Sequence, residues 1–242
     1  MSAILEVRHL RKQFGKKVAV KDISFSMHDG EIVGLLGPNG AGKTTVFYMI
    51  AGFLQPSLGG IFLDDMEITR LPMYRRAREG IAYLPQEPSV FRKLTVEDNI
   101  LSILETRKDL DKTRRSALLE NLLEELGIAR LRKQQAFTLS GGERRRTEIA
   151  RALAIEPHFL LLDEPFAGID PIAVHDIKAI IRLLAEKGIG VLITDHNVRD
   201  TLDITQRAFI INVGQILTSG TQQEILNDDL ARQIYLGDHF RL

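Results

Sequence analysis

Apolar residues gather in short runs that recur along the whole chain. Most of the later runs are continuous, without polar alternation, as is typical of strands covered on both faces of a parallel sheet. They span residues 32–36, 81–84, 159–162, 190–193 and 208–211. Residues 5–10 and 23–27 instead alternate apolar and polar positions, which predicts a small antiparallel sheet. The pattern therefore predicts an α/β fold with a parallel-sheet core and a flanking antiparallel β-subdomain.

The stretch from about Thr95 to Leu131 has a different period. Its apolar residues recur every three or four positions with charged residues between them, which predicts amphipathic helices. They are Val96, Ile100, Ile103, Leu104, Leu118, Leu119, Leu122, Leu123 and Leu126. We expect one domain over 1–242, in which a helical subdomain at about 87–157 is inserted between the core segments 1–86 and 158–242.

Composition removes several kinds of chemistry. The 242 residues include no cysteine, so disulfides, thiolate catalysis and cysteine-ligated metal centres are excluded. Basic and acidic residues are equal at 32 each, without the basic bias of many nucleic-acid binders. The start of the chain lacks a basic segment before an apolar stretch, and no run approaches the ~18 apolar residues of a spanning helix. A cytosolic setting fits, and at a membrane we expect the chain to dock.

A phosphate-binding loop follows the run that ends at Leu36. Its residues are Gly37, Pro38, Asn39, Gly40, Ala41, Gly42, Lys43, Thr44 and Thr45. They match G-x-x-x-x-G-K-[ST] between a predicted strand and a helix expected from Thr44 to about Ala51. The glycines let backbone N–H groups converge on a phosphate, Lys43 adds charge, and Thr44 offers a hydroxyl to Mg²⁺. By itself the loop indicates a nucleoside triphosphate and leaves the reaction open.

Polar side chains stand where three of the continuous runs end, the usual place for a ligand crevice in an α/β sheet. Asp163 suits the ligand set of Mg²⁺, and Glu164 suits a base that orients and deprotonates the attacking water. His196 is a candidate contact to the γ-phosphate, and the amide oxygen of Gln86 would ligand Mg²⁺ or hold the water. A polar strand end, a structural histidine and an ordinary loop glutamine are the alternatives.

A second anion-binding helix terminus is predicted at residues 139–143. Ser140 can cap a helix that runs to about Ile155, while Gly141 and Gly142 expose backbone N–H groups. Three arginines, 144–146, crowd this positive helix end and oppose its dipole. A capped helix with a solvated basic face explains the same residues, so the physics leaves both interpretations open.

Taken together, these motifs resemble the complete set of the ABC ATPases. The set comprises the P-loop, Gln86, Leu-Ser-Gly-Gly-Glu at 139–143, Asp163-Glu164, Gly-Ile-Asp-Pro at 168–171 and His196. In that family two nucleotide domains pair head to tail. The resemblance therefore implies a homodimer in which Ser140, Gly141 and Gly142 close over the ATP held by the other copy. It also implies that Glu164 is the base and His196 the switch.

Two further roles are implied by the same resemblance. Asp170 is expected in the dimer seam near His196. Phe14 matches the position where the family stacks an aromatic, usually a tyrosine, on adenine, and phenylalanine keeps the π-face. Packing of Phe14 on the protein core is the alternative.

Within the family the chain is similar along its length to the ATPases of bacterial lipopolysaccharide export. The similarity is carried by residues 37–50, 83–87, 142–153, 163–171 and 235–242. ATPases of branched-chain amino-acid import share much of the scaffold and are the nearest alternative. The resemblance implies two copies beneath a pair of integral-membrane permease subunits, at the cytoplasmic face of the inner membrane, without direct contact to the cargo or to nucleic acid.

Docking on the permease is expected in the segment 88–93. There Phe91 stands beside Arg92 and Lys93, and an exposed aromatic next to cations suits a partner helix. Local packing of the aromatic is the alternative.

Three other classes of protein fit the motifs less well. A soluble ABC machine acting on nucleic acid or ribosomes would carry a long coiled-coil insertion or a second motif set. A P-loop kinase would have no need of Ser140, Gly141 and Gly142, and a nucleotide sensor would lack a base such as Glu164.

Overall fold

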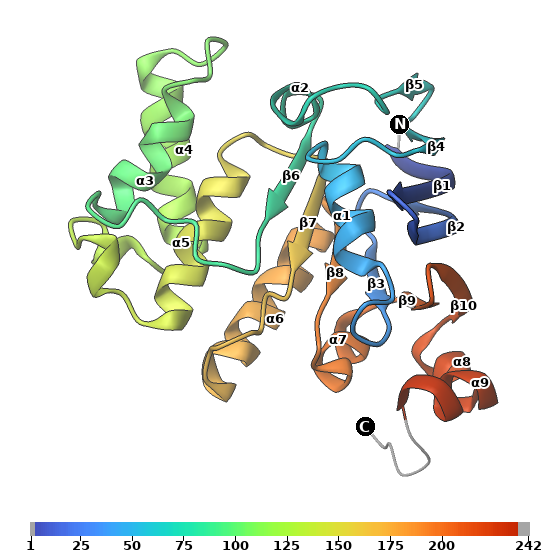
Figure 1. The fold of residues 1–242 in the computed structure, drawn as a ribbon. Helices are drawn as coiled ribbons and strands as arrows, with labels where there is room; N and C mark the ends of the chain where they lie inside the picture. The colour runs from blue at the N-terminus through green and yellow to red at the C-terminus, as the bar shows by residue number, and fades with distance from the viewer. Residues whose placement is uncertain (1–2, 237–242) are drawn as a thin grey trace.

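The computed structural model describes residues 3–236 and places ten strands in one sheet (Figure 1). Their order is β5 (Met66–Glu67), β4 (Leu58–Leu63), β1 (Ile4–Phe14), β2 (Lys17–His28), β10 (Gln215–Gly220), β9 (Arg207–Asn212), β3 (Ile32–Leu36), β8 (Gly190–Thr194), β7 (Phe159–Asp163) and β6 (Ile81–Leu84). Pairing is parallel from β9 through β3, β8 and β7 to β6, whereas β1 pairs antiparallel with β2 and β4. The predicted fold class, with a parallel core and a flanking antiparallel β-subdomain, is confirmed.

Nine α-helices accompany the sheet within residues 3–236. They are α1 (Lys43–Ala51), α2 (Met73–Arg78), α3 (Val96–Leu104), α4 (Lys112–Glu125), α5 (Gly141–Leu153), α6 (Pro171–Glu186), α7 (Val198–Ile204), α8 (Gln222–Asn227) and α9 (Asp229–Ala231). Helices α3, α4 and α5 follow β6, precede β7 and stand to one side of the sheet (Figure 1). In the described part of the chain, no helix has the length and apolarity that a membrane crossing requires.

Side-chain caps set the starts of several helices, because the first N–H groups of a helix have no partner within it. The side chain of Thr95 accepts from Asp98 N at the start of α3, and Ser140 and Glu143 form a reciprocal capping box at the start of α5. Asp170 caps α6 by accepting from Ala173 N at 3.0 Å. Helix α5 ends at Leu153, two residues before the predicted end.

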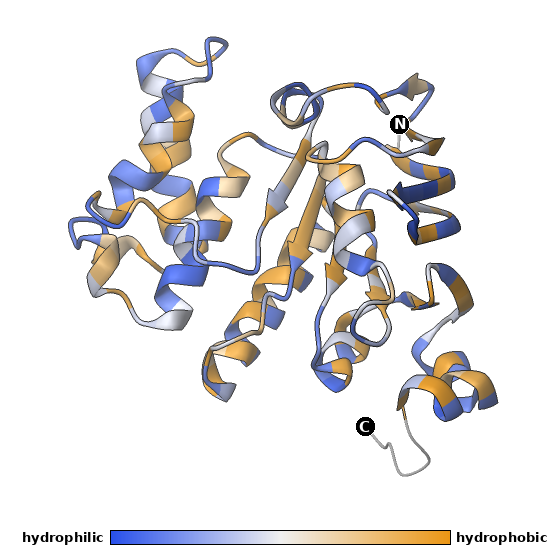
Figure 2. Cartoon of the chain, in the orientation of Figure 1, coloured by the Kyte–Doolittle hydropathy of each residue, from blue (hydrophilic) through white to orange (hydrophobic). Residues whose placement is uncertain are grey.

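The core lies on both faces of the parallel strands, which explains why their apolar runs are continuous. In β7, Leu160 and Leu162 pack into a cluster shared with the helices α3 to α6. Phe159 and Leu161 point the other way, into a cluster shared with α1 and the β-subdomain. Hydropathy coloring shows mostly hydrophobic central strands, and hydrophobic and hydrophilic residues interspersed along helices such as α4 and α6 (Figure 2). Asp163 follows the alternation and lies on the α1 face.

Candidate active site

The P-loop joins β3 to α1 through backbone conformations that glycine adopts readily. Gly37 and Gly42 have φ values of 148° and 113°, and a Cβ on Gly37 would lie 2.1 Å from the carbonyl oxygen of Ile211. The buried Lys43 donates from Nζ to the carbonyl oxygens of Gly37 at 2.6 Å and Pro38 at 3.1 Å. Burial lowers the pKa of Lys43 despite the nearby carboxylates of Glu164 and Asp163. The loop thus holds an ammonium group against its own carbonyls.

A cavity of about 420 Å³ lies over this loop. The predicted site residues that line it are Phe14, Asn39, Gly40, Gly42, Lys43, Thr44, Thr45, Asp163, Glu164 and His196. They come from the end of β1, the P-loop and the carboxyl ends of β7 and β8, which lie side by side in the sheet. The fold therefore gathers a phosphate loop, two carboxylates, a histidine and an aromatic ring at one opening.

Glu164 accepts contacts from two of the other predicted residues. Its Oε1 lies 2.7 Å from His196 Nε2, and its Oε2 accepts from Gln86 Nε2 at 2.6 Å. The backbone at Glu164 is left-handed, with φ of 47°, and its N–H donates to the carbonyl of Thr194 at 2.8 Å. Such a conformation is unusual for glutamate and is typical of functional sites. Burial raises the pKa of Glu164, which favours a carboxylate able to take up a proton.

Asp163 ends β7 with its carboxylate almost entirely buried. The hydroxyl of Tyr83 donates to Oδ2 at 3.1 Å, and burial raises the pKa of Asp163. The exposed Thr44 lines the same cavity, as does Thr194, whose buried Oγ1 has no hydrogen-bond partner among residues 3–236. Oxygen ligands of this kind suit Mg²⁺. No group of three or more His, Asp or Glu able to hold a metal occurs in residues 3–236, so a cation here would take further ligands from phosphate and water.

The raised pKa of Asp163 predicts how stability depends on pH. The folded protein holds this proton more tightly than the unfolded chain, so folding loses stability as pH rises through the raised pKa. Without nucleotide or metal at pH 7, Asp163→Asn should therefore melt above the wild type, by about 2–4 °C for each 1 kcal/mol. The gain should vanish below about pH 4, where the unfolded aspartate is also protonated. Thermal melts from about pH 3 to 8 check this, and a variant less stable than wild type at pH 7 would contradict it.

The three arginines at the start of α5 point to different partners, which the sequence analysis missed. Arg145 is buried and donates to the carbonyl oxygens of Pro85 at 2.8 Å and Asp163 at 3.3 Å. Arg146 pairs with Asp176 of α6 at 3.4 Å, while Arg144 lines a cavity beside Gln86. Since the buried Arg145 ties the ends of β6 and β7 to α5, the alternative of a solvated basic face is wrong for this residue. The available signal was helical periodicity, because three consecutive residues of a helix face in different directions.

Asp195 is a second residue that the sequence analysis missed. It is 4% exposed, and its two carboxylate oxygens accept from the backbone N–H groups of Phe166 at 3.0 Å and Asn197 at 2.8 Å. These bonds join the loop after Glu164 to the segment that carries His196. Asp195 stands one residue past the continuous apolar run 190–193, which is close to the signal that identified Asp163 directly after the run 159–162.

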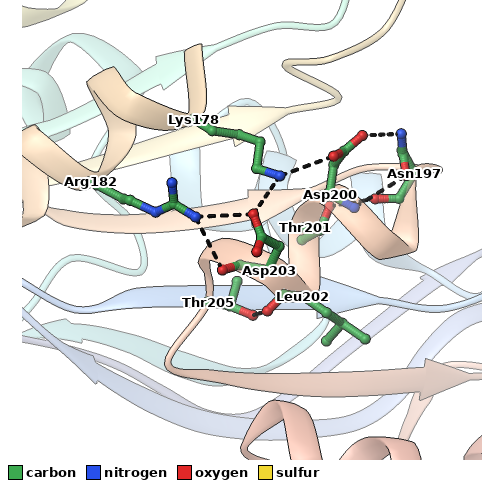
Figure 3. Close-up of polar contacts among 8 residues, drawn as sticks. All are labelled: Lys178, Arg182, Asn197, Asp200, Thr201, Leu202, Asp203 and Thr205. Atoms are coloured by element: carbon green, nitrogen blue, oxygen red, sulfur yellow. Dashed lines mark hydrogen bonds and ion pairs between the residues drawn. The ribbon is translucent and has the colours of Figure 1, made fainter. Parts of the chain in front are cut away.

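The segment after His196 is fixed by ion pairs between α6 and α7 (Figure 3). Lys178 of α6, whose side chain is 12% exposed, contacts Asp200 Oδ1 at 3.0 Å and Asp203 Oδ2 at 2.5 Å. Arg182 also reaches Asp203, at 3.0 Å. Asp200 in turn contacts Asn197, the cap of α7 and the neighbour of His196. The arrangement ties the start of α7 to α6.

Removal of the lysine should loosen α7. Lys178→Met leaves Asp200 and Asp203 without their shared cation, and we expect amide exchange in residues 198–204 to accelerate by about tenfold. Arg182→Met is the matched control, because an exposed pair contributes about 0–1 kcal/mol and this change keeps both lysine contacts. Hydrogen exchange with mass spectrometry measures both variants. Equal exchange in the two would show that Lys178 has no special part.

The predicted signature residues lie away from the cavity over the P-loop. Ser140 is exposed and caps α5, and a Cβ on Gly142 would lie 2.7 Å from Ala173 Cβ of α6. Neither Ser140, Gly141 nor Gly142 lines the P-loop cavity of the same chain, and the exposed Asp170 does not line it either. Gln86 is likewise outside its lining and reaches the site through Glu164. Within one chain, these residues therefore do not line the cavity over the P-loop.

The two predicted aromatic contacts have different surroundings. Phe14 is 48% exposed at the rim of the P-loop cavity, with Lys12 Nζ 5.2 Å from its ring center. Phe91 is 51% exposed and borders a separate, mostly apolar cavity of about 610 Å³, which Arg92 does not line. The cation over the Phe91 ring is Arg151 of α5, at 5.1 Å. Of the carboxyl-terminal stretch 235–242 used in the resemblance, residues 237–242 lie outside the described part of the chain.

Comparison with known proteins gives the family. A family model described as ABC transporter matches residues 20–167, and the chain belongs to that family. It is 55% identical over 242 residues, the whole of both chains, to the lipopolysaccharide export system ATP-binding protein LptB of Acidithiobacillus ferridurans. It is 52% identical to the protein of the same description in Escherichia coli (strain K12), over 99% of this chain and 100% of that one.

Solved structures agree with the family. An ATP-binding cassette of an ABC transporter in its ADP conformation superposes with a TM-score of 0.86 and is 30% identical, covering 98% of this chain and 99% of the other. The recognition of an ABC ATPase from its motifs is thereby confirmed, and the chain is the ATP-binding and ATP-hydrolysing part of such a system.

Proposed function

We propose that this chain is the ATPase subunit that powers lipopolysaccharide export from the inner membrane. The observation that carries the proposal is the 52–55% identity, over essentially the full length of both chains, to proteins described as ATP-binding components of that export system. The cavity over the P-loop, with Lys43, Asp163 and Glu164 in its lining, supports an ATPase at work in that system.

Each of the site residues would have a separate role in ATP hydrolysis. Lys43 and the backbone of residues 37–45 would hold the phosphates, and Phe14 would stack on adenine. Thr44, Asp163 and Gln86 would hold Mg²⁺, which would supply positive charge to neutralise the charge that develops on the phosphates. Glu164 would take a proton from the attacking water, while His196, 2.7 Å from it, orients the carboxylate and contacts the γ-phosphate. Gln86 donates to the other oxygen of Glu164 and holds it in place.

A homodimer would complete this site. The signature residues Ser140, Gly141 and Gly142 lie outside the P-loop cavity of their own chain, so they are free to face the nucleotide of a second copy. Asp170, at the exposed start of α6, would lie in the seam. A cassette of the same fold, 23% identical, is described as dimeric in a post-hydrolysis state with ADP and phosphate. We therefore propose two sites per dimer, each built from both copies.

The dimer would act beneath two integral-membrane permease subunits at the cytoplasmic face of the inner membrane. Phe91 borders the apolar cavity of about 610 Å³ between α1, α2, β6 and α5, and a partner helix seated there would cover its exposed ring. Arg92, exposed beside it, would meet the rim of such a helix. The cargo would contact the permease subunits and not this chain.

Affinity purification from native membranes tests the proposal. The full chain is tagged, extracted in mild detergent and analysed by mass spectrometry for attached integral-membrane proteins. We expect permeases of lipopolysaccharide export. Recovery of branched-chain amino-acid permeases would replace the cargo while keeping the ATPase, and the absence of any membrane partner would contradict the transport role.

A further inference from the structure

Tyr83 takes part in two cavities at once. Its ring lines the apolar cavity of about 610 Å³ beside Tyr48 and Phe53, with ring centers 6.1 and 5.3 Å away. Its hydroxyl donates to Oδ2 of Asp163 at 3.1 Å, and Asp163 lines the cavity over the P-loop. One side chain therefore connects the wall of the first cavity with a carboxylate of the second.

The sheet register explains how the two residues meet. Strands β6 and β7 are parallel, with Tyr83 opposite Leu161. Because side chains alternate between the faces of a sheet, Tyr83, Leu161 and Asp163 point to the same side. Asp163 is then the diagonal neighbour of Tyr83, at a separation that a long aromatic side chain can span. The contact is built into the pairing of two buried strands and needs no flexible loop.

The hydroxyl of Tyr83 constrains the orientation of the Asp163 carboxylate. The terminal torsion of an aspartate is broad and nearly two-fold, so its orientation must be set by a partner. In residues 3–236 the structure shows Tyr83 as the donor on Oδ2 and shows no donor on Oδ1.

The backbone of Asp163 is held by a second residue, Arg145 of α5. Glu148 lines the apolar cavity and accepts from Arg145 at 3.2 Å, and Arg145 donates to the Asp163 carbonyl at 3.3 Å. With Tyr83 on the carboxylate and Arg145 on the carbonyl, Asp163 is fixed at both its side chain and its main chain.

We propose that Tyr83 is a positioning residue for Asp163, and that its hydroxyl turns the carboxylate so that one oxygen is presented to a nucleotide-bound divalent cation. The inference rests on the proposed function, which gives Asp163 the role of metal ligand. A residue in the wall of the apolar cavity thereby helps to determine metal affinity at the ATP site.

Metal binding by the full-length Tyr83→Phe variant tests the proposal, since this change keeps the ring and removes one oxygen. Mn²⁺ is titrated into the protein with a non-hydrolysable ATP analogue, and the free ion is followed by electron paramagnetic resonance. Loss of an outer partner of a metal ligand lowers affinity by about 10–100-fold, and we expect the lower end of that range. The matched control is Tyr74→Phe, which deletes a hydroxyl from a side chain 54% exposed on α2.

Two further measurements separate the possible failures. Without metal, the analogue should bind equally well to both tyrosine variants. If Tyr83→Phe weakens metal-free binding of the analogue as much as it weakens Mn²⁺ binding, Tyr83 has only a structural role. Asp163→Asn should weaken Mn²⁺ binding more than Tyr83→Phe does. If only Asp163→Asn weakens it, the inference on Tyr83 is wrong and the role of Asp163 stands. If neither does, Asp163 is no metal ligand, and both ideas fail.

Discussion

Glu164→Gln should bind MgATP with unchanged affinity and hydrolyse it about 10²–10⁴-fold more slowly than the wild type. The amide has nearly the shape of the carboxylate and keeps one oxygen for Gln86 or His196, which contact Glu164 at 2.6 and 2.7 Å. It cannot accept a proton from water. Because ATP is then bound and not consumed, the ATP-bound dimer should accumulate, and size-exclusion chromatography with MgATP would detect it.

The matched control is Glu79→Gln, the same chemical change at an exposed position at the end of α2. Its hydrolysis rate should equal that of the wild type. Near-normal hydrolysis by Glu164→Gln would remove Glu164 from the role of base. Loss of MgATP binding by that variant would mean instead that the carboxylate supports the geometry of the site.

Two inactive variants should restore activity when they are mixed. Lys43→Ala removes the ammonium group from the P-loop, and Ser140→Arg blocks the signature end of α5. In a head-to-tail dimer of one copy of each, one site combines the intact P-loop with the intact signature of the partner. With random pairing and independent sites, the mixture should reach about a quarter of the wild-type rate.

Rates of ATP hydrolysis before and after mixing provide the measurement. Ser140→Arg also removes a helix cap, worth about 1 kcal/mol, so melting temperatures must show that both variants are folded. A mixture no more active than the average of its parts would mean that the signature serves the P-loop of its own chain. The position of Ser140 outside that chain's P-loop cavity argues for restoration.

The fold was largely predictable because its strongest signals are local. Continuous apolar runs at 32–36 and 190–193 could only be covered on two faces, and both became central parallel strands. The helices α3 and α4 appeared where helical periodicity predicted them. Features that depend on distant segments were not predicted. Strand β1 extends to Phe14, beyond the predicted end at residue 10, because it pairs with two other strands. The sequence of one segment does not show its pairing partners.

The candidate site divides in the same way. Residues tied to a motif, such as Lys43 and Asp163, were named from spacing alone, since a phosphate loop must follow a strand and a carboxylate must end one. Arg145 and Asp195 were missed because their partners are backbone groups of distant segments, at Pro85, Asp163 and Phe166. Nothing near an arginine in sequence tells which carbonyl it will meet.

The sequence by itself determined the family, the order of elements and the kinds of chemical group available, because these depend on residue type and on spacing along one strand or helix. The tertiary structure alone decided which groups meet: Tyr83 with Asp163, Gln86 and His196 with Glu164, and Lys178 with the start of α7. The reason is physical. Strand order and register set distances between segments far apart in the chain, and a hydrogen bond or ion pair forms only within a few ångströms.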